Sequence, residues 1–490
     1  MAVNSLNFMF FFVVVFLVYY MPRISQQKQL QNWWLLLTSY FFYGFVDWKM
    51  LPILFGITLV FYLIGLWLKD TMNKNHIRRA SLITSLGILI GVGFLLYFKY
   101  LNFFADSFSS LLNKLGVQAT WSTLNIVLPV GVSFFTFKLM SYLIEIHREK
   151  IQPTGNFVEF ATYIAFFPTI LSGPIDRPNT FLPQLRKNHY FNYSKTVDGC
   201  RQILWGLFLK MFIADKLAAS TSLAWNGFEN YSSIQLLYAA LLSPIQVYAD
   251  FDGYSNMAIG VGKVLGFNVT KNFNHPLLAR NVAEYWRRWH MSLTSWITDY
   301  VFMPLNFHFR NYANWGIFFA ITINLVVIGM WHGANWTYAV FGLYHSILFI
   351  PLIVSSSFGK NKKIKSGEHG LPKSMDVLKM AFTYLLIAIG HIIFFSKDAN
   401  SAFSYFKALL DINAYTSLHI GEIGLPHYYY LLLSALIIIE WITRDKEYGL
   451  CFVESKVFAN RTIRLFLYAI LFLLSITLSV EHSAFIYFQF

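Results

Sequence analysis

The sequence predicts an all-α protein that crosses a membrane many times. Hydrophobic residues make up 56% of the 490 residues and charged residues only 13%, whereas a soluble domain usually carries about 25% charged residues. The mean hydropathy is +0.49. Apolar runs long enough to cross ~30 Å of hydrocarbon recur along the whole chain. We therefore expect one membrane-embedded domain over residues 1–490, with a motif-rich core at 124–355 and about 11–13 transmembrane or re-entrant helices.

Windows of span length locate the expected helices. They lie near 5–21, 32–47, 51–68, 80–98, 124–146, 196–217, 232–250, 314–331, 336–355, 376–396, 427–443 and 464–480. The first run has no basic segment before it and no small-residue cleavage site after it, so we expect it to be retained. Three further stretches, 157–173, 254–267 and 284–305, are apolar but short or interrupted. Those are expected to be re-entrant or interfacial pieces.

The net charge of +14 is best explained by membrane topology. Lys and Arg are concentrated in short loops between apolar segments, a pattern that indicates cytoplasmic loops and argues against a nucleic-acid partner. The basic residues that follow the first, third and fifth expected helices are Arg23, Lys28, Lys69, Lys74, Arg78, Arg79, Arg148 and Lys150. Both termini are then external. The basic loop 359–373 is expected to be cytoplasmic and solvated, with an anionic lipid site as the alternative.

Two cysteines, Cys200 and Cys451, exclude a disulfide framework and a cysteine metal cluster. Asp250 and Asp252 precede Gly253, and Ser255 and Asn256 follow it, but this spacing does not match a calcium loop and no third acidic ligand lies nearby. We therefore expect a polar lining or a helix break at Gly253 and no metal site. Motifs for a serine nucleophile, a zinc protease and a phosphate-binding loop are all missing from the sequence.

The densest polar cluster is "AEYWRRWHMSLTSWITDY", at 283–300. Its charged and aromatic residues are Glu284, Arg287, Arg288 and His290, interleaved with Trp286, Trp289 and Trp296. A single helix would place the glutamate one turn from both arginines and Trp286 one turn from His290. One interpretation is an interfacial anchor with an internal Glu–Arg pair. The other is a cationic site for a phosphate-bearing donor.

A second cluster, "MWHGANW", lies between two long apolar segments. If the preceding helix starts at the cytoplasmic face after Arg310, the residues from Gly316 to Trp331 rise only ~24 Å. His332 then lies in the outer half of a ~30 Å hydrocarbon core. An ionisable group at that depth usually marks a functional pathway, although a lone buried histidine is often only a hydrogen-bonded structural residue.

The residues after this histidine predict a tight turn. Gly333 and Asn335 allow the chain to reverse before Trp336 begins a returning helix. His345 on that helix and His391 on the next are weaker candidates, and a packing role is the simpler interpretation of each.

Four motifs together resemble the membrane-bound O-acyltransferase family, in particular its bacterial alginate O-acetyltransferase type. They are "LPVGVSFFTFKLMSYLIEIHREK" (128–150), "FPTILSGPIDRP" (167–178), "YADFDGYSNMAIG" (248–260) and "YWRRWHMSLTSWITDYVFMPL" (285–305) followed by "WHGANW" (331–336). The terminal "FIYFQF" resembles the same type. One departure is Ser255–Asn256, where the family motif often has Ser-Asp.

The resemblance implies a ring of helices around a tunnel that joins a cytoplasmic donor side to an external acceptor side. It implies that His332 is the essential catalytic histidine and that His290 lies in the tunnel nearer the donor. The predicted donor-binding or tunnel-lining residues are Arg287, Arg288, Trp286, Asn335, Trp331, Trp336, Asp252 and Tyr254.

The expected reaction is acyl transfer in the bacterial cytoplasmic membrane. His332 would accept the proton of an acceptor hydroxyl that attacks an acyl thioester, with Asn335 or a backbone N–H as oxyanion donor and Trp331 and Trp336 excluding water. The co-substrate is expected to be acetyl-coenzyme A or another cytoplasmic thioester, with no permanently bound cofactor. The acceptor is expected to be an exported polysaccharide, or a periplasmic or extracellular partner that relays the acyl group.

Two alternatives remain open from the sequence. The first stays within the family and changes the substrate, to D-alanyl transfer onto teichoic acid or fatty acylation of a lipid. The second is a flippase or transporter of lipid-linked sugars without covalent chemistry, although no repeated halves with paired broken helices support it.

Overall fold

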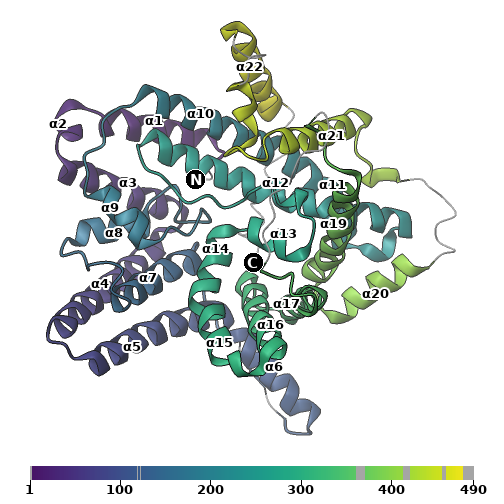
Figure 1. Ribbon diagram of the computed structural model, residues 1–490, viewed down its shortest axis with the longest axis horizontal. Helices are drawn as coiled ribbons and strands as arrows, with labels where there is room; N and C mark the ends of the chain where they lie inside the picture. Colours follow the sequence, from purple (N-terminus) through teal and green to yellow (C-terminus); the bar gives the residue numbers. More distant parts are fainter. Residues whose placement is uncertain are drawn as a thin grey trace. The chain divides into compact units, whose positions relative to one another are not determined.

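The computed structural model describes residues 3–118, 120–121, 123–359, 370–411, 420–454 and 460–477. The described residues form helices and no strands (Figure 1), which confirms the all-α prediction. They separate into two compact units, Met1–Ile203 with Met257–Thr270 and Leu204–Asn256 with Lys271–Phe490. The expectation of one membrane-embedded domain over residues 1–490 stays a prediction.

The first unit is built from packed helices with an aromatic core. Its elements are α1 (Leu6–Tyr19), α2 (Pro22–Ser25), α3 (Lys28–Asp47), η1 (Trp48–Met50), α4 (Leu51–Asn73), α5 (Ile77–Leu95), η2 (Leu96–Tyr100), α6 (Leu101–Lys114), α7 (Val132–His147), α8 (Phe157–Ala165), α9 (Pro178–Leu185) and most of α10 (Tyr193–Leu207). Helices α4, α5 and α7 pack on one another. Phe61, Tyr142 and Phe160 are fully buried there. This apolar packing holds α4 and α5 side by side (Figure 1).

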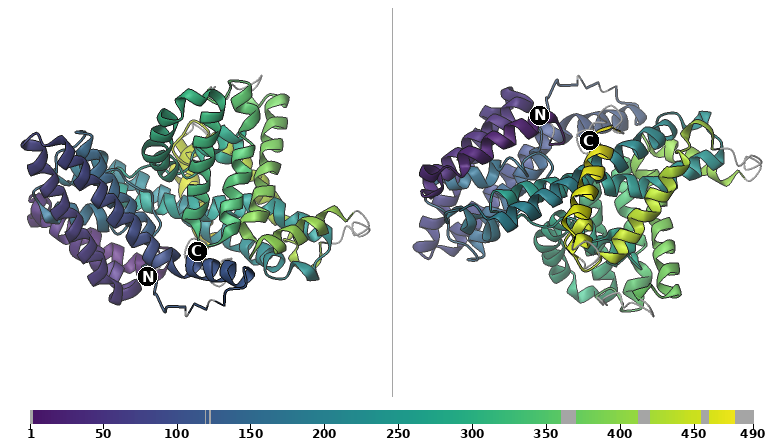
Figure 2. Two further views of the ribbon diagram at one scale, coloured as in Figure 1. Left: turned by 90° about the horizontal axis from the view of Figure 1, so that it is seen from below. Right: turned by 90° about the horizontal axis from the view of Figure 1, so that it is seen from above.

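The second unit carries the sequence clusters at 283–300 and 330–336. Its elements are η3 (Phe208–Ala214), α11 (Asp215–Asn226), η4 (Phe228–Asn230), the first part of α12 (Ser233–Val264), η5 (Pro276–Leu278), α13 (Val282–Arg288), α14 (Met291–Ile297), η6 (Thr298–Phe302), α15 (Met303–His308), η7 (Arg310–Tyr312), α16 (Ala313–His332), α17 (Trp336–Ile347), α18 (Ile350–Val354), α19 (Ser374–Phe395), α20 (Ala399–Leu410), η10 (Gly421–Ile423), α21 (His427–Ile442), η11 (Gly449–Glu454) and α22 (Arg461–Thr477). Helices α16, α17 and α19 lie side by side (Figure 2).

Five described stretches are long and apolar enough to cross a membrane. They are Lys28–Asn73, Ile77–Lys114, Arg310–His332, Trp336–Val354 and Ser374–Phe395, and α1 and α21 are shorter apolar helices. The remaining expected spans, 124–146, 196–217, 232–250 and 464–480, are helical over most of their described length but are not among these five stretches. The terminal "FIYFQF", the end of the last expected span, the C-terminus and residues 360–369 of the basic loop lie outside the described residues.

Two helices differ from the sequence prediction. The helix expected from residue 124 begins only at Val132, because Pro129 lacks an N–H donor and Gly131 adopts a left-handed conformation with φ 75°. The expected break at Gly253 is wrong, since α12 continues through it to Val264. At Gly253 the missing side chain instead allows close packing, because a Cβ there would lie 2.8 Å from the backbone nitrogen of Lys210.

A buried ion triad joins η3, α11 and α12 in the second unit. The Lys210 ammonium lies 2.7 Å from Asp215 and 2.5 Å from Asp250, and all three side chains are buried. Asp250 therefore neutralises a buried lysine. Removing one member of such a group leaves an uncompensated buried charge, whereas replacing all members with neutral groups avoids that cost.

We predict that Lys210→Met lowers the free energy of unfolding by ~3–5 kcal/mol, because it leaves two buried carboxylates without their cation. Thermal unfolding of the purified protein in detergent would measure the loss. Adding Asp215→Asn and Asp250→Asn should restore most of it. As a control, Lys74→Met removes an ion pair with Asp70 in which both side chains are 61% exposed, so it should have little effect. Equal melting temperatures for Lys210→Met and Lys74→Met would contradict the assignment.

Candidate functional site

The hairpin between α16 and α17 presents a buried histidine where the first helix ends. His332 is the last residue of α16, and α17 begins at Trp336, as the sequence predicted. The His332 side chain is buried, and its ring packs edge-on against Trp331 and Phe394 at 5.2 Å each. The end of α16 thus places one imidazole among aromatic rings.

Gly333 has a steric role at this hairpin. Its φ of −172° is extended backbone that any residue adopts, so the predicted conformational role of this glycine is wrong. A Cβ at this position would lie 2.4 Å from the ring of Tyr338. The glycine therefore lets the start of α17 close directly over the end of α16.

Asn335 and Trp336 lie at the start of α17. Asn335 caps α17, with Oδ1 accepting from the Thr337 N–H at 2.9 Å and Nδ2 donating to the Lys397 carbonyl at 2.6 Å. Both ends of the amide thus make structural hydrogen bonds, and this geometry does not support Asn335 as the oxyanion donor. Trp336 is 56% exposed. Trp331 and Phe394, both buried, shield the histidine instead.

The cluster at 283–300 is not one helix, which corrects the sequence prediction. Helix α13 ends at Arg288, Trp289 is extended, and His290 adopts a left-handed conformation with φ 42° before α14 begins. A non-glycine residue in that conformation costs about 1 kcal/mol or more. Hydrogen bonds from outside the segment stabilise the break, including one from the Met291 N–H to the Asn272 carbonyl at 2.7 Å.

Because of this break, Trp286 and His290 do not stack. Trp286 donates its indole N–H to Nδ1 of His345 at 3.3 Å. The ring of His290 instead packs edge-on against Phe251, with centroids 4.6 Å apart. The His345 ring therefore has a structural partner, and so does His391, whose Nδ1 lies 3.2 Å from the Ser243 hydroxyl. Both hydrogen bonds agree with the packing interpretation of these two histidines.

Asn272 positions His290 and is not among the residues predicted from the sequence. Its Oδ1 accepts from Nδ1 of His290 at 3.0 Å and from the Ser292 hydroxyl at 2.9 Å, while its Nδ2 donates to the Ser255 hydroxyl at 3.1 Å. All four side chains are buried. Since an amide oxygen only accepts, neutral His290 carries its proton on Nδ1 and its lone pair on Nε2. The polar run "KNFNH" was the one available signal.

The two predicted catalytic histidines come together in the second unit. The ring of Trp331 contacts both imidazoles, at 5.4 Å from His290 and 5.2 Å from His332. A buried pair of imidazoles with one oriented lone pair is suited to moving a proton.

The two arginines of α13 have different surroundings. Glu284 accepts from Arg280 at 3.0 Å and from Arg288 at 2.7 Å. Burial raises the pKa of Glu284, but these hydrogen bonds and positive charges outweigh it and hold the pKa below its usual value. Arg288 therefore belongs to an internal ion pair, as the anchor interpretation predicted. Arg287 is exposed and donates to the Phe358 carbonyl at 3.1 Å.

The remaining predicted residues lie in or beside a separate polar cluster. Asp252 is buried, and so are Glu440 and His275, whose carboxylate oxygen and Nδ1 lie 2.7 Å apart. Tyr254 is buried on the next turn of α12. Within the described ranges, no three His, Cys, Asp or Glu residues are grouped to hold a metal ion.

Comparisons with known proteins identify the family of this chain. The model of the membrane-bound O-acyltransferase family matches residues 2–366. The chain is 32% identical over 410 residues to a probable alginate O-acetylase of Pseudomonas aeruginosa, covering 81% of this chain and 74% of the relative. It is 30% identical over 411 residues to a peptidoglycan O-acetyltransferase of Helicobacter pylori, covering 78% and 74%. It is 29% identical over 301 residues to a teichoic acid D-alanyltransferase of Streptococcus thermophilus, covering 57% and 70%.

The family match covers more than half of the chain and includes both histidine clusters. Together with the apolar helices, it establishes a multi-pass membrane protein with O-acyltransferase activity and sets aside the flippase alternative. The chain belongs to the membrane-bound O-acyltransferase family.

Proposed function

We propose that the protein moves an acetyl group from a cytoplasmic acyl thioester to a hydroxyl of an exported cell-envelope polysaccharide, or to a partner protein that relays it. The observation that carries this proposal is the burial of His332 and His290 around the ring of Trp331. The alginate and peptidoglycan relatives, which match about four fifths of the chain, support an acetyl donor and a glycan acceptor.

In the proposed step, His332 acts as the general base. The acceptor oxygen attacks the carbonyl carbon of the thioester while His332 takes the hydroxyl proton. The carbon–sulfur bond then breaks, and the proton passes from His332 to the leaving thiolate. The products are an ester and a free thiol, so no proton is gained or lost overall. The aromatic enclosure excludes water, which protects the thioester from hydrolysis.

His290 is proposed to act beside His332. Its Nδ1–H is held by Asn272, so its Nε2 lone pair has a fixed direction. That nitrogen can accept a hydrogen bond from the acceptor hydroxyl and orient it for attack. Arg287, exposed on α13, is proposed to bind a phosphate of the donor, with acetyl-coenzyme A as the simplest phosphate-bearing thioester.

The proposed location is the bacterial cytoplasmic membrane, with both termini outside. The basic residues between α4 and α5 support the orientation, because short loops rich in Lys and Arg remain cytoplasmic. A donor made in the cytoplasm and an acceptor outside then meet at a site within the membrane. An extracytoplasmic acyltransferase partner is proposed for the relayed route.

A second candidate reaction is D-alanyl transfer to teichoic acid. It rests on the similarity to the D-alanyltransferase of Streptococcus thermophilus, which extends over 57% of the chain. The longer coverage by the O-acetyltransferases favours acetyl transfer. Incubation of the protein with labelled acetyl and D-alanyl thioesters separates the two reactions.

We predict that His332→Ala abolishes acyl transfer without reducing folding. The imidazole supplies the proton acceptor, so its removal should stop the reaction. Its own contacts are ring contacts, and a smaller side chain at this position should leave the rest of the packing intact. The test is mass spectrometry of O-acetyl groups on cell-envelope glycans from a deletion strain that expresses either the wild-type or the variant protein. Equal membrane levels and melting temperatures provide the control. Near-normal acetylation with the variant would contradict the role of His332 as general base.

We predict that Arg287→Gln and Arg288→Gln have different effects. Arg287→Gln should raise KM for acetyl-coenzyme A about ten-fold, because a charged hydrogen bond to phosphate is lost, with little change for a phosphate-free acetyl thioester. Arg288→Gln should lower the melting temperature instead, because it removes a cation from buried Glu284. Identical kinetic and thermal effects of the two variants would argue against a donor role for Arg287.

A further inference from the structure

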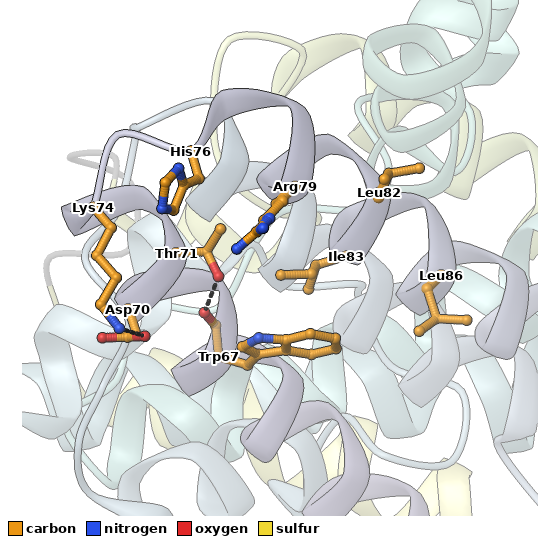
Figure 3. Close-up of a pocket in the computed structure, with 9 residues that line it drawn as sticks. All are labelled: Trp67, Asp70, Thr71, Lys74, His76, Arg79, Leu82, Ile83 and Leu86. Atoms are coloured by element: carbon orange, nitrogen blue, oxygen red, sulfur yellow. Dashed lines mark hydrogen bonds and ion pairs between the residues drawn. The ribbon is translucent and has the colours of Figure 1, made fainter.

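A cavity of about 540 Å³ lies between α4 and α5 in the first unit, at the turn that joins them. Figure 3 shows the side chains that surround it. They are Trp67, Asp70, Thr71 and Lys74 from α4 and its end, and His76, Arg79, Leu82, Ile83 and Leu86 from the start of α5. None of these residues belongs to the histidine site or to any of the four family motifs.

The cavity has a polar end and an apolar end. Lys74, His76 and Arg79 line the end near the turn, whereas Leu82 and Leu86 line the other end together with the indole of Trp67 (Figure 3). Trp67, Leu82 and Leu86 are all exposed large hydrophobic residues. Such a lining suits a ligand with a charged head and an apolar tail.

The charge at the polar end is positive. Asp70 is the one acidic residue in the lining, and Lys74 already neutralises it at 2.6 Å. Within the described parts of the chain, no carboxylate lies within ion-pair distance of the Arg79 guanidinium. An anion bound at this end would supply the missing partner.

The start of α5 adds a second reason to expect an anion. The N-terminus of a helix carries about half a positive charge, so acidic residues stabilise the first turn and basic residues destabilise it. The first turn of α5 contains no acidic residue, and the side chain of its cap, His76, makes no capping hydrogen bond. Arg78 and Arg79 both lie in this turn. Three positive contributions thus meet beside the cavity.

We propose that this cavity binds an anionic phospholipid. The phosphate contacts Arg79 and His76, and the first methylenes of an acyl chain lie along Trp67, Leu82 and Leu86. The dimensions agree, because Leu86 is about 10 Å along the helix axis from Arg79 at ~1.5 Å per residue. That distance spans the headgroup region and the upper part of the hydrocarbon. Tryptophan is also typical of that level.

A phospholipid accounts for the lining better than free phosphate. Inorganic phosphate would use the basic end and leave the exposed apolar end without a ligand. Positive loops beside the membrane also attract the anionic lipids of the cytoplasmic leaflet. The site would therefore hold the α4–α5 turn at the level of the headgroups.

The test is native mass spectrometry of the delipidated full-length protein, titrated with phosphatidylglycerol, phosphatidylcholine or inorganic phosphate. Arg79→Gln should weaken phosphatidylglycerol binding about ten-fold, the effect of one lost charged hydrogen bond. Arg78→Gln is the matched control, because Arg78 is an exposed neighbour of equal charge that does not line the cavity. It should change binding less than two-fold. Trp67→Ala tests the apolar end and should weaken binding of the lipid but not of phosphate.

Three outcomes would overturn the proposal. Equal losses in Arg78→Gln and Arg79→Gln would mean a diffuse surface charge with no specific site. Equal affinity for phosphatidylcholine would mean that the headgroup charge is not recognised. Displacement of phosphatidylglycerol by millimolar inorganic phosphate, with no effect of Trp67→Ala, would mean a free-phosphate site.

Discussion

Polar side chains of the candidate site obtain hydrogen bonds from other protein atoms, and the arrangement of the site depends on those bonds. An unpaired buried polar group costs several kcal/mol in an apolar environment. The side-chain amide of Asn272 forms hydrogen bonds with three buried neighbours, His290, Ser292 and Ser255. These bonds stabilise the break between α13 and α14, and the break brings His290 beside Trp331.

Pairing within the protein also distinguishes two kinds of charged side chain, namely those that already have an ion-pair partner and those that can still bind a ligand. Lys210, Glu284 and Arg288 are buried or half-buried, and each has an ion-pair partner in the protein. Arg287 and Arg79, in contrast, are exposed, and each has guanidinium donors beyond those that the protein uses. Neighbouring arginines in the sequence thus have different roles, and burial together with the nearest carboxylate decides which.

Much of the fold was predictable from apolar periodicity and length. Helix α16 appears within one residue of its predicted ends and α17 begins at the predicted residue, although α17 ends at Ile347 and α18 continues the predicted span to Val354. Long apolar runs that end at glycine and asparagine admit few other structures. The break inside 283–300 and the continuity of α12 through Gly253 were not predictable. Both depend on partners distant in sequence, namely Asn272 for the break and the η3 backbone for the continuous helix.

The sequence by itself determined the class of protein, the family motifs and the two histidines. Composition and motif order are properties of the amino-acid sequence, so they are known without coordinates. Only the tertiary structure decided that Trp331 contacts both imidazoles, that Asn335 is used as a helix cap, that Arg288 is neutralised while Arg287 is exposed, and that a half-basic cavity lies between α4 and α5. The physical reason is that side-chain direction and burial arise from packing between distant segments, which no local pattern encodes.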